Sequence, residues 1–85
     1  MSNEINRIKW KCRRGMREID LLLREFSKKS IKNLSNKDLS LFDEILDYDD
    51  QKLYDFIFKN QPIGNKDHES FIIKNLKTFT EQGNF

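Results

Sequence analysis

Apolar residues recur every three or four positions along almost the whole chain, which is the spacing of one face of an α-helix. The first stripe contains Ile5, Ile8, Cys12, Met16, Ile19, Leu22, Leu23 and Phe26. Gly15 interrupts this stripe, and a glycine in a helix interior costs about 0.8–1 kcal/mol relative to alanine. The pattern therefore predicts two helices with a kink or break at Gly15, the second of which frays over residues 28–33.

The next helix is predicted from its capping residues. Ser35, followed three residues later by Asp38, is a weak capping box. The helix that it begins ends near residue 47. Its predicted buried face consists of Leu39, Phe42, Ile45 and Leu46.

Two more helices follow. Asp49 or Asp50 can cap a short helix, which Asn60 closes and Pro62 stops. Asn65 can cap the last helix. The predicted apolar set of the short helix is Leu53, Tyr54, Ile57 and Phe58, and that of the last helix is Phe71, Ile72, Leu76 and Phe79.

Strand signals are almost absent, because no alternating apolar and polar run persists for more than a few positions. We therefore predict an all-α fold, a compact bundle of about five short helices. Residues 1–85 form one domain in this interpretation, with an ordered core at about residues 4–80 and a polar tail at 82–85.

Length and composition restrict the class of protein. With 85 residues and 36% hydrophobic side chains, the chain has room for one small domain with a thin core. A single cysteine excludes an intramolecular disulfide. No apolar run reaches ten residues, which argues against a membrane span and a signal peptide. We therefore expect a soluble cytoplasmic protein that does not bind membranes.

The charges are unevenly distributed although the formal net charge is only +2. Residues 1–17 contain six basic residues and one acidic residue, a net charge of +5, whereas residues 38–55 contain one basic and seven acidic residues, a net charge of −6. Either the two segments face each other within the fold, or they form two distinct surfaces for a partner.

Few residues have the chemistry of a catalytic site. Cys12 and His68 lack a third orienting group at a known spacing, so we interpret Cys12 as a buried small hydrophobe and His68 as a solvated side chain. The three glycines form no phosphate-binding loop. Adjacent Asp49 and Asp50 are better explained by helix capping than by metal binding or acid–base chemistry. The residues alone therefore favour neither an enzyme nor a metal site.

The basic N-terminal segment is the best candidate for a binding surface. Tryptophan and arginine are enriched at interface hot spots, and the guanidinium group binds carboxylates or phosphates through two parallel hydrogen bonds. If one helix continued through the segment, one face would contain Arg7, Trp10, Lys11, Arg14 and Glu18. The alternative is that Trp10 folds into the core and Arg14 pairs with Glu18.

The same residues resemble a known family. Residues 14–18, Arg-Gly-Met-Arg-Glu, match the RGxxE motif of the FAD assembly factor family of succinate dehydrogenase. The similarity extends over residues 9–23 and over a second block at residues 46–57, and it covers the chain from about Glu4 to Phe79. Gln51 stands where the family usually has proline, and Phe56 where it usually has tryptophan.

The resemblance implies a small helical assembly factor with the family's five-helix fold. Such a factor binds the flavoprotein subunit of succinate dehydrogenase, and often that of fumarate reductase, and promotes covalent attachment of FAD to a histidine of that subunit. FAD then belongs to the partner. We expect a monomer whose partner-binding residues are Arg14, Gly15 and Glu18, surrounded by Arg7, Trp10 and Arg17.

Two other functions stay open at this point. A basic helix with Trp10 could bind the phosphates of a nucleic acid, as in a regulator or an antitoxin. However, there is no helix-turn-helix pattern, and the acidic segment would repel a phosphate backbone. The third possibility is an adaptor for some other protein, which would use the same surface.

Overall fold

The computed structural model describes residues 2–81, except for the side chains of residues 2, 3, 79 and 81. The α-helices are α1 (Ser2–Lys11), α2 (Arg17–Ser30), α3 (Asn36–Ile45), α4 (Asp50–Lys59), α5 (Lys66–Phe71) and α6 (Thr78–Glu81). A 3₁₀ turn, η1 (Ile31–Asn33), follows α2, and a π-helical stretch, η2 (Ile72–Lys77), joins α5 to α6. Because α5, η2 and α6 form one continuous rod, the described residues form five helical rods without a strand, and the predicted all-α fold is confirmed.

The helix ends lie where the capping residues predicted them. The side chains of Ser35, Asp49 and Asn65 each accept a hydrogen bond from the backbone N–H three residues later. Asn60 ends α4 in the left-handed conformation, with φ of 59°, which asparagine tolerates better than most residues. The predicted break at Gly15 is also confirmed, because α1 ends at Lys11 and α2 begins at Arg17.

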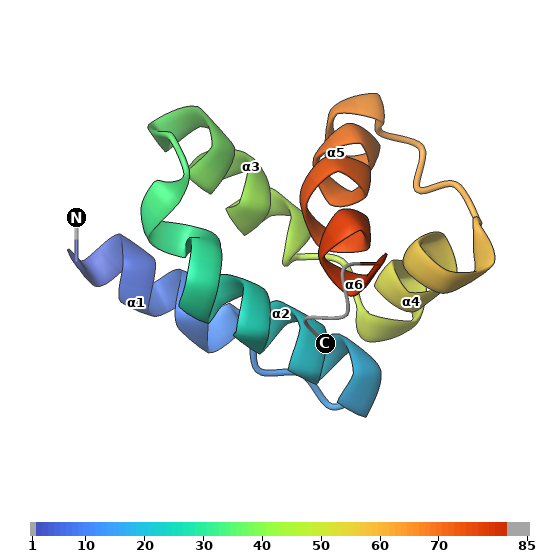
Figure 1. Ribbon diagram of the computed structural model, residues 1–85, viewed down its shortest axis with the longest axis horizontal. Helices are drawn as coiled ribbons and strands as arrows, with labels where there is room; N and C mark the ends of the chain where they lie inside the picture. Colours follow the sequence, from blue (N-terminus) through green and yellow to red (C-terminus); the bar gives the residue numbers. More distant parts are fainter. Residues whose placement is uncertain (1, 82–85) are drawn as a thin grey trace.

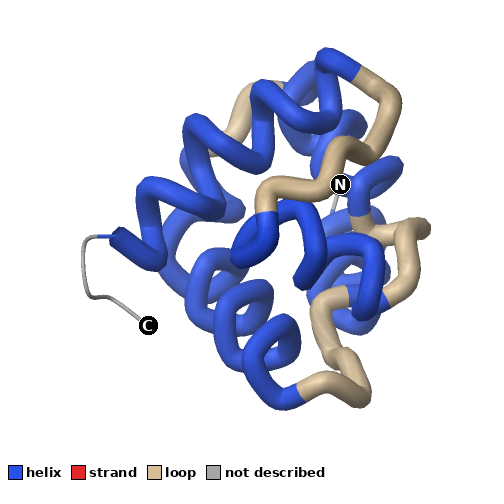
Figure 2. The backbone as a smooth tube through the Cα atoms, turned by 90° about the vertical axis from the view of Figure 1, so that its right-hand side faces the viewer, coloured by secondary structure: helices blue, strands red, loops and turns tan. Residues whose placement is uncertain are grey.

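The helices pack as crossing rods around one core (Figure 1). In the figure α1 and α2 run in opposite directions; α3 packs against α5, and α4 contacts both α2 and η2. The connections between helices are short, as the side view shows (Figure 2). No helix among the described residues is both long enough and apolar enough to cross a membrane.

Three aromatic rings from different helices form the centre of the core. Phe26 of α2 meets Phe42 of α3 edge to face, with ring centroids 5.2 Å apart, and Phe42 stacks on Phe71 of α5 at 5.8 Å. Such aromatic pairs contribute about 0.5–1.5 kcal/mol beyond the area that they bury. Cys12 and Ile8 of the N-terminal segment are fully buried beside this cluster, as the apolar stripe predicted.

The predicted apolar face of α4 is wrong at Phe58 and missed Phe56, while Tyr54 packs partly buried against the core. In α4 the buried residues are Leu53, Phe56 and Ile57, whereas Phe58 is 40% exposed and packs beside the ring of Tyr54. Residues 53, 56 and 57 share a helix face, while residue 58 lies well around the helix from them. The predicted position of Phe79 in the core and the polar tail at 82–85 lie outside what the structure describes.

Burial makes the Cys12 thiol unreactive. Removal from water raises its pKa to about 11, because the thiolate loses its solvation. We expect iodoacetamide to modify native Cys12 at about pH 8 roughly a hundredfold more slowly than an exposed thiol. Mass spectrometry measures this rate, with the urea-unfolded protein as the fast control. Equal rates in both states would contradict the buried position.

Candidate functional site

The RGxxE residues lie at the junction between α1 and α2. The chain leaves α1 after Lys11, passes through residues 12–16 without helical structure, and enters α2 at Arg17. The helical wheel predicted from the sequence placed Arg14 on one helix face with Trp10 and Glu18, which requires a single continuous helix. Because the helix breaks here, that face does not form: Arg14 points into the protein, while Trp10 and Glu18 are exposed.

Arg14 binds four acceptors of its own chain. Its Nε donates to Oδ1 of Asp50 at 2.6 Å, and its Nη1 donates to the carbonyl oxygens of Lys11 at 3.0 Å and Leu46 at 2.8 Å. Its Nη2 donates to the carbonyl oxygen of Tyr48. Lys11 and Leu46 lie at the C-terminal ends of α1 and α3, where carbonyl groups lack helical partners. The Arg14 side chain is only 12% exposed, so it fastens the fold instead of pairing with Glu18.

The carboxylate of Asp50 completes this junction. Its Oδ2 accepts hydrogen bonds from the backbone N–H groups of Gly15 at 3.1 Å and Met16 at 3.0 Å. Met16 precedes α2 and supplies no side-chain cap, so a negative charge from α4 occupies the position that favours one. Burial alone would raise the pKa of Asp50, but the hydrogen bonds from Arg14 and from the two backbone groups lower it below its ordinary value.

A second carboxylate, Asp43, pairs with two basic residues of α1, Arg7 and Lys11. The guanidinium group of Arg7 binds both of its oxygens, at 3.1 and 2.9 Å, and Nζ of Lys11 lies 2.6 Å from Oδ1. Lys11 also pairs with Asp47 at 2.8 Å. The hydrogen bond from Arg7 is the largest cause of the lowered pKa of Asp43. The basic and acidic segments therefore face each other, the first of the two arrangements that their charges left open, and residues 38–55 are more than a solvated face with helix caps.

The other predicted binding residues stay at the surface. Trp10 is 69% exposed, and the guanidinium carbon of Arg13 lies 5.0 Å from its ring centroid, so Trp10 does not fold into the core. Arg17 and Glu18, in the first turn of α2, are exposed, and neither forms an ion pair within the described part of the chain.

Gly15 is exposed and has no conformational need to be glycine. Its φ is not in the left-handed region, and an added Cβ atom would meet only Oδ2 of Asp50, at an ordinary 3.7 Å. Because Gly15 lies outside both helices, it also does not carry the helix penalty that the sequence suggested. Within residues 2–81, no contact and no backbone angle explains the absence of a side chain here.

His68 is buried, so its prediction as a solvated side chain is wrong. It is 8% exposed; its Nδ1 lies 2.6 Å from the hydroxyl of Tyr48, and its Nε2 lies 2.9 Å from Oε1 of Glu44. The hydrogen-bond partners come from the segment that also binds Arg14. His68 therefore helps to hold the backbone of Tyr48, whose carbonyl accepts a hydrogen bond from Arg14.

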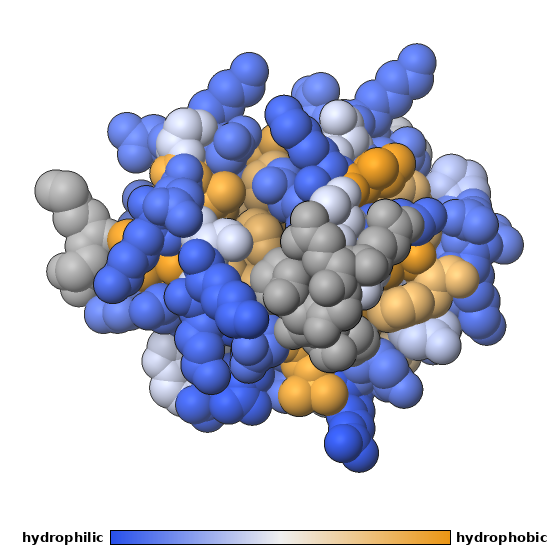
Figure 3. Space-filling view, viewed as in Figure 1, coloured by the Kyte–Doolittle hydropathy of each residue, from blue (hydrophilic) through white to orange (hydrophobic). Residues whose placement is uncertain are grey.

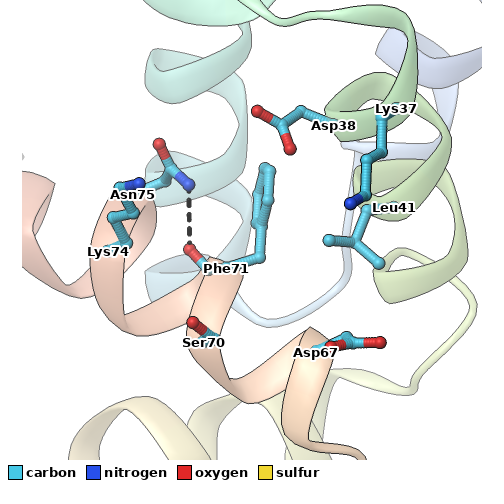
Figure 4. Close-up of a pocket in the computed structure, with 8 residues that line it drawn as sticks. All are labelled: Lys37, Asp38, Leu41, Asp67, Ser70, Phe71, Lys74 and Asn75. Carbon is cyan, nitrogen blue, oxygen red and sulfur yellow. Dashed lines mark hydrogen bonds between the residues drawn. The ribbon is translucent and has the colours of Figure 1, made fainter.

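A separate hollow of about 270 Å³ lies between α3 and α5 (Figure 4). Its lining contains both positive and negative side chains, but no histidine or cysteine. Its one aromatic ring, Phe71, belongs to the core. The figure shows no convergent set of reactive groups among the labelled residues, so this hollow is not a candidate catalytic site.

Replacing Asp50 with asparagine tests the junction. Asp50→Asn leaves the Arg14 guanidinium without its counter-charge, and we expect it to lower the free energy of unfolding at pH 7 by about 2–3 kcal/mol. Urea unfolding measures this change. Asp49→Asn is the matched control, because asparagine caps a helix as well as aspartate does.

The lowered pKa of Asp50 also predicts how the stability of the fold depends on pH. The pKa of Asp50 is lower in the folded than in the unfolded protein, so its stabilisation is complete above about pH 4 and is lost as the pH falls through the folded pKa. Stability should therefore fall less steeply below about pH 4 in Asp50→Asn than in the wild type. Parallel pH profiles of the two proteins would contradict the assigned ion pair.

Comparisons with known proteins identify the family. The sequence model of a family described as "Flavinator of succinate dehydrogenase" matches residues 6–80. FAD assembly factor SdhE of Coxiella burnetii is 41% identical over 51 residues, which cover 60% of this chain but only 62% of that protein, less than two thirds.

Two further relatives carry the same name, FAD assembly factor SdhE. That of Legionella pneumophila (strain Paris) is 40% identical over 60 residues, 71% of this chain and 76% of that protein. That of Wigglesworthia glossinidia brevipalpis is 43% identical over 68 residues, 80% of each chain. No solved structure gives a significant match. The match over residues 6–80 shows that the chain belongs to the family of flavinators of succinate dehydrogenase.

Proposed function

We propose that this protein binds the flavoprotein subunit of succinate dehydrogenase and promotes covalent attachment of FAD to that subunit. The observation that carries the proposal is the exposed Gly15, whose missing side chain nothing in the chain requires. A partner backbone that approaches this point closely would require it. The adjacent Glu18 offers a free carboxylate to the same partner.

The chain acts by binding in this proposal, and the covalent bond forms within the partner. A rigid helical module can hold two parts of the flavoprotein so that the accepting histidine lies near the flavin ring. Such positioning raises the population of reactive geometries without a catalytic group of its own. The chain itself therefore needs neither bound FAD nor a metal ion, and it is not an enzyme in this interpretation.

Arg14 and the exposed residues have different parts in this proposal. Arg14 fixes the backbone of the junction through Asp50, and Gly15, Arg17, Glu18 and Trp10 contact the partner. Arg7 extends the surface along α1, where it is exposed but already paired with Asp43. The flavoprotein subunit of fumarate reductase is a second partner in this proposal.

Two substitutions at Gly15 separate contact from folding. Gly15→Arg adds a long side chain where close approach is proposed, and we expect loss of most covalent flavin in the partner subunit. Gly15→Ala is the smaller companion change: its Cβ makes only an ordinary contact within the chain, so the variant should fold normally, and any loss of covalent flavin then reports the close approach of the partner. In-gel flavin fluorescence of the denatured subunit measures attachment, in cells whose own factor is replaced by each variant.

Glu18→Gln tests the carboxylate in the same assay. We expect reduced flavin attachment with an unchanged thermal melt, because the residue forms no ion pair in the described part of the chain. If Gly15→Arg and Glu18→Gln both fold normally and restore wild-type levels of covalent flavin, the assigned contact surface is wrong.

A further inference from the structure

The fold neutralises only part of the basic N-terminal segment. Arg7, Lys11 and Arg14 pair with the acidic segment. Lys9 and Arg13 lie on another side of the same segment, are exposed, and form no ion pair with a carboxylate in the part of the chain that the structure describes. Ion pairing within the described part of the chain therefore does not explain why these two residues are charged.

These two cations lie where two surface hollows meet. One hollow of about 320 Å³ borders Trp10, and another of about 190 Å³ lies between the end of α1 and α2. Lys9 and Arg13 line both hollows, which are therefore neighbours on the surface, and we call the two together the basic groove. Its lining residues are Asn6, Lys9, Trp10, Arg13, Arg24, Ser27 and Lys28.

The groove contains four cations and no carboxylate among its lining residues. Arg24 pairs with Asp20 at 3.2 Å and Lys28 pairs with Glu25 at 3.4 Å. Both are surface pairs between residues four and three positions apart in α2. Such pairs contribute little to stability, so an incoming carboxylate can compete for both cations. Over α1 and α2 the face in Figure 3 is mostly hydrophilic, with smaller apolar patches.

Arg13 is already positioned for binding. Its guanidinium group lies over the Trp10 ring, a cation–π contact that restricts the side chain while its N–H groups stay available. A pre-oriented guanidinium loses less entropy when it binds a carboxylate through two hydrogen bonds. Trp10 offers an apolar surface beside these charges, as in the centre of many protein interfaces.

We propose that the basic groove binds a short acidic segment of the flavoprotein subunit, beside the contact at Gly15. This inference rests on the proposed function. It adds a second contact, at the basic groove, and states the chemistry of the partner segment that binds there. A segment with two or more carboxylates, next to an apolar side chain that packs on Trp10, fits the charges and the ring. Trp10 borders the groove and belongs to the proposed partner-binding residues, so the two contacts share this side chain in the proposal.

A nucleic acid fits the groove less well. Arg24 and Lys28 are about 6 Å apart along the helix axis, so the cations cover a short stretch. A duplex carries a phosphate charge about every 1.7 Å and continues in both directions. Exposed Glu4 and Glu18 flank this segment of the chain, and an extended phosphate backbone would meet them.

Charge reversal tests the groove. The double variant Lys9→Glu/Arg13→Glu is compared with Lys32→Glu/Lys66→Glu, which makes the same change of net charge at exposed residues outside the groove. Titration calorimetry with the purified flavoprotein subunit gives each Kd at about 50, 150 and 500 mM salt. We expect the groove variant to bind at least about tenfold more weakly at 150 mM salt, with a smaller difference at 500 mM.

The possible outcomes distinguish the two proposals. If the wild type binds and the groove variant binds equally well, or loses no more affinity than the control variant, the groove is not part of the interface. If the wild type does not bind the subunit, the proposed function itself fails, and this inference with it. If a short DNA duplex displaces the subunit from the wild type at 150 mM salt but not from the groove variant, the groove is a nucleic-acid site instead.

Discussion

The carboxylate of Asp50 links helix α4 to the turn between α1 and α2. One oxygen binds the guanidinium group of Arg14, and the other binds the backbone of the turn before α2. Through Arg14 the same unit reaches the carbonyl groups at the ends of α1 and α3. A domain of this size has a thin core, so a fixed position for the turn depends strongly on such polar contacts.

This constraint explains why the turn can be both exposed and well defined. A loop without helical hydrogen bonds is normally among the more mobile parts of a protein. Here the Asp50 carboxylate of α4 accepts hydrogen bonds from the backbone N–H groups of Gly15 and Met16. The turn is thereby fixed on the side that faces α4, while Gly15 stays exposed to solvent. A glycine in that position presents bare backbone at a fixed place, and a close partner contact needs both properties.

The sequence predicted the local features of the fold better than the contacts between distant segments. Ser35, Asp49 and Asn65 each bind the backbone N–H three residues later, and the N–H of Asn60 donates to the carbonyl oxygen of Asp55, five residues earlier. Spacing alone revealed these short-range features. The Arg14–Asp50 pair spans 36 positions, and only the opposite charges of the two segments hinted at it. His68 gave no signal, because its partners Tyr48 and Glu44 lie on another part of the chain.

The RGxxE residues therefore divide into an internal and an external part. Arginine in such a motif is easily interpreted as the residue that contacts the partner, since its side chain is typical of interfaces. In this chain its donors are engaged by internal acceptors, whereas neighbouring Arg13 keeps its guanidinium group over an exposed ring. Two adjacent arginines thus have opposite environments: Arg14 fixes the shape of the turn, and Arg13 provides charge that the fold does not use. Loss of function after substitution of Arg14 would consequently report a displaced turn, while substitution of Arg13 would report the surface itself.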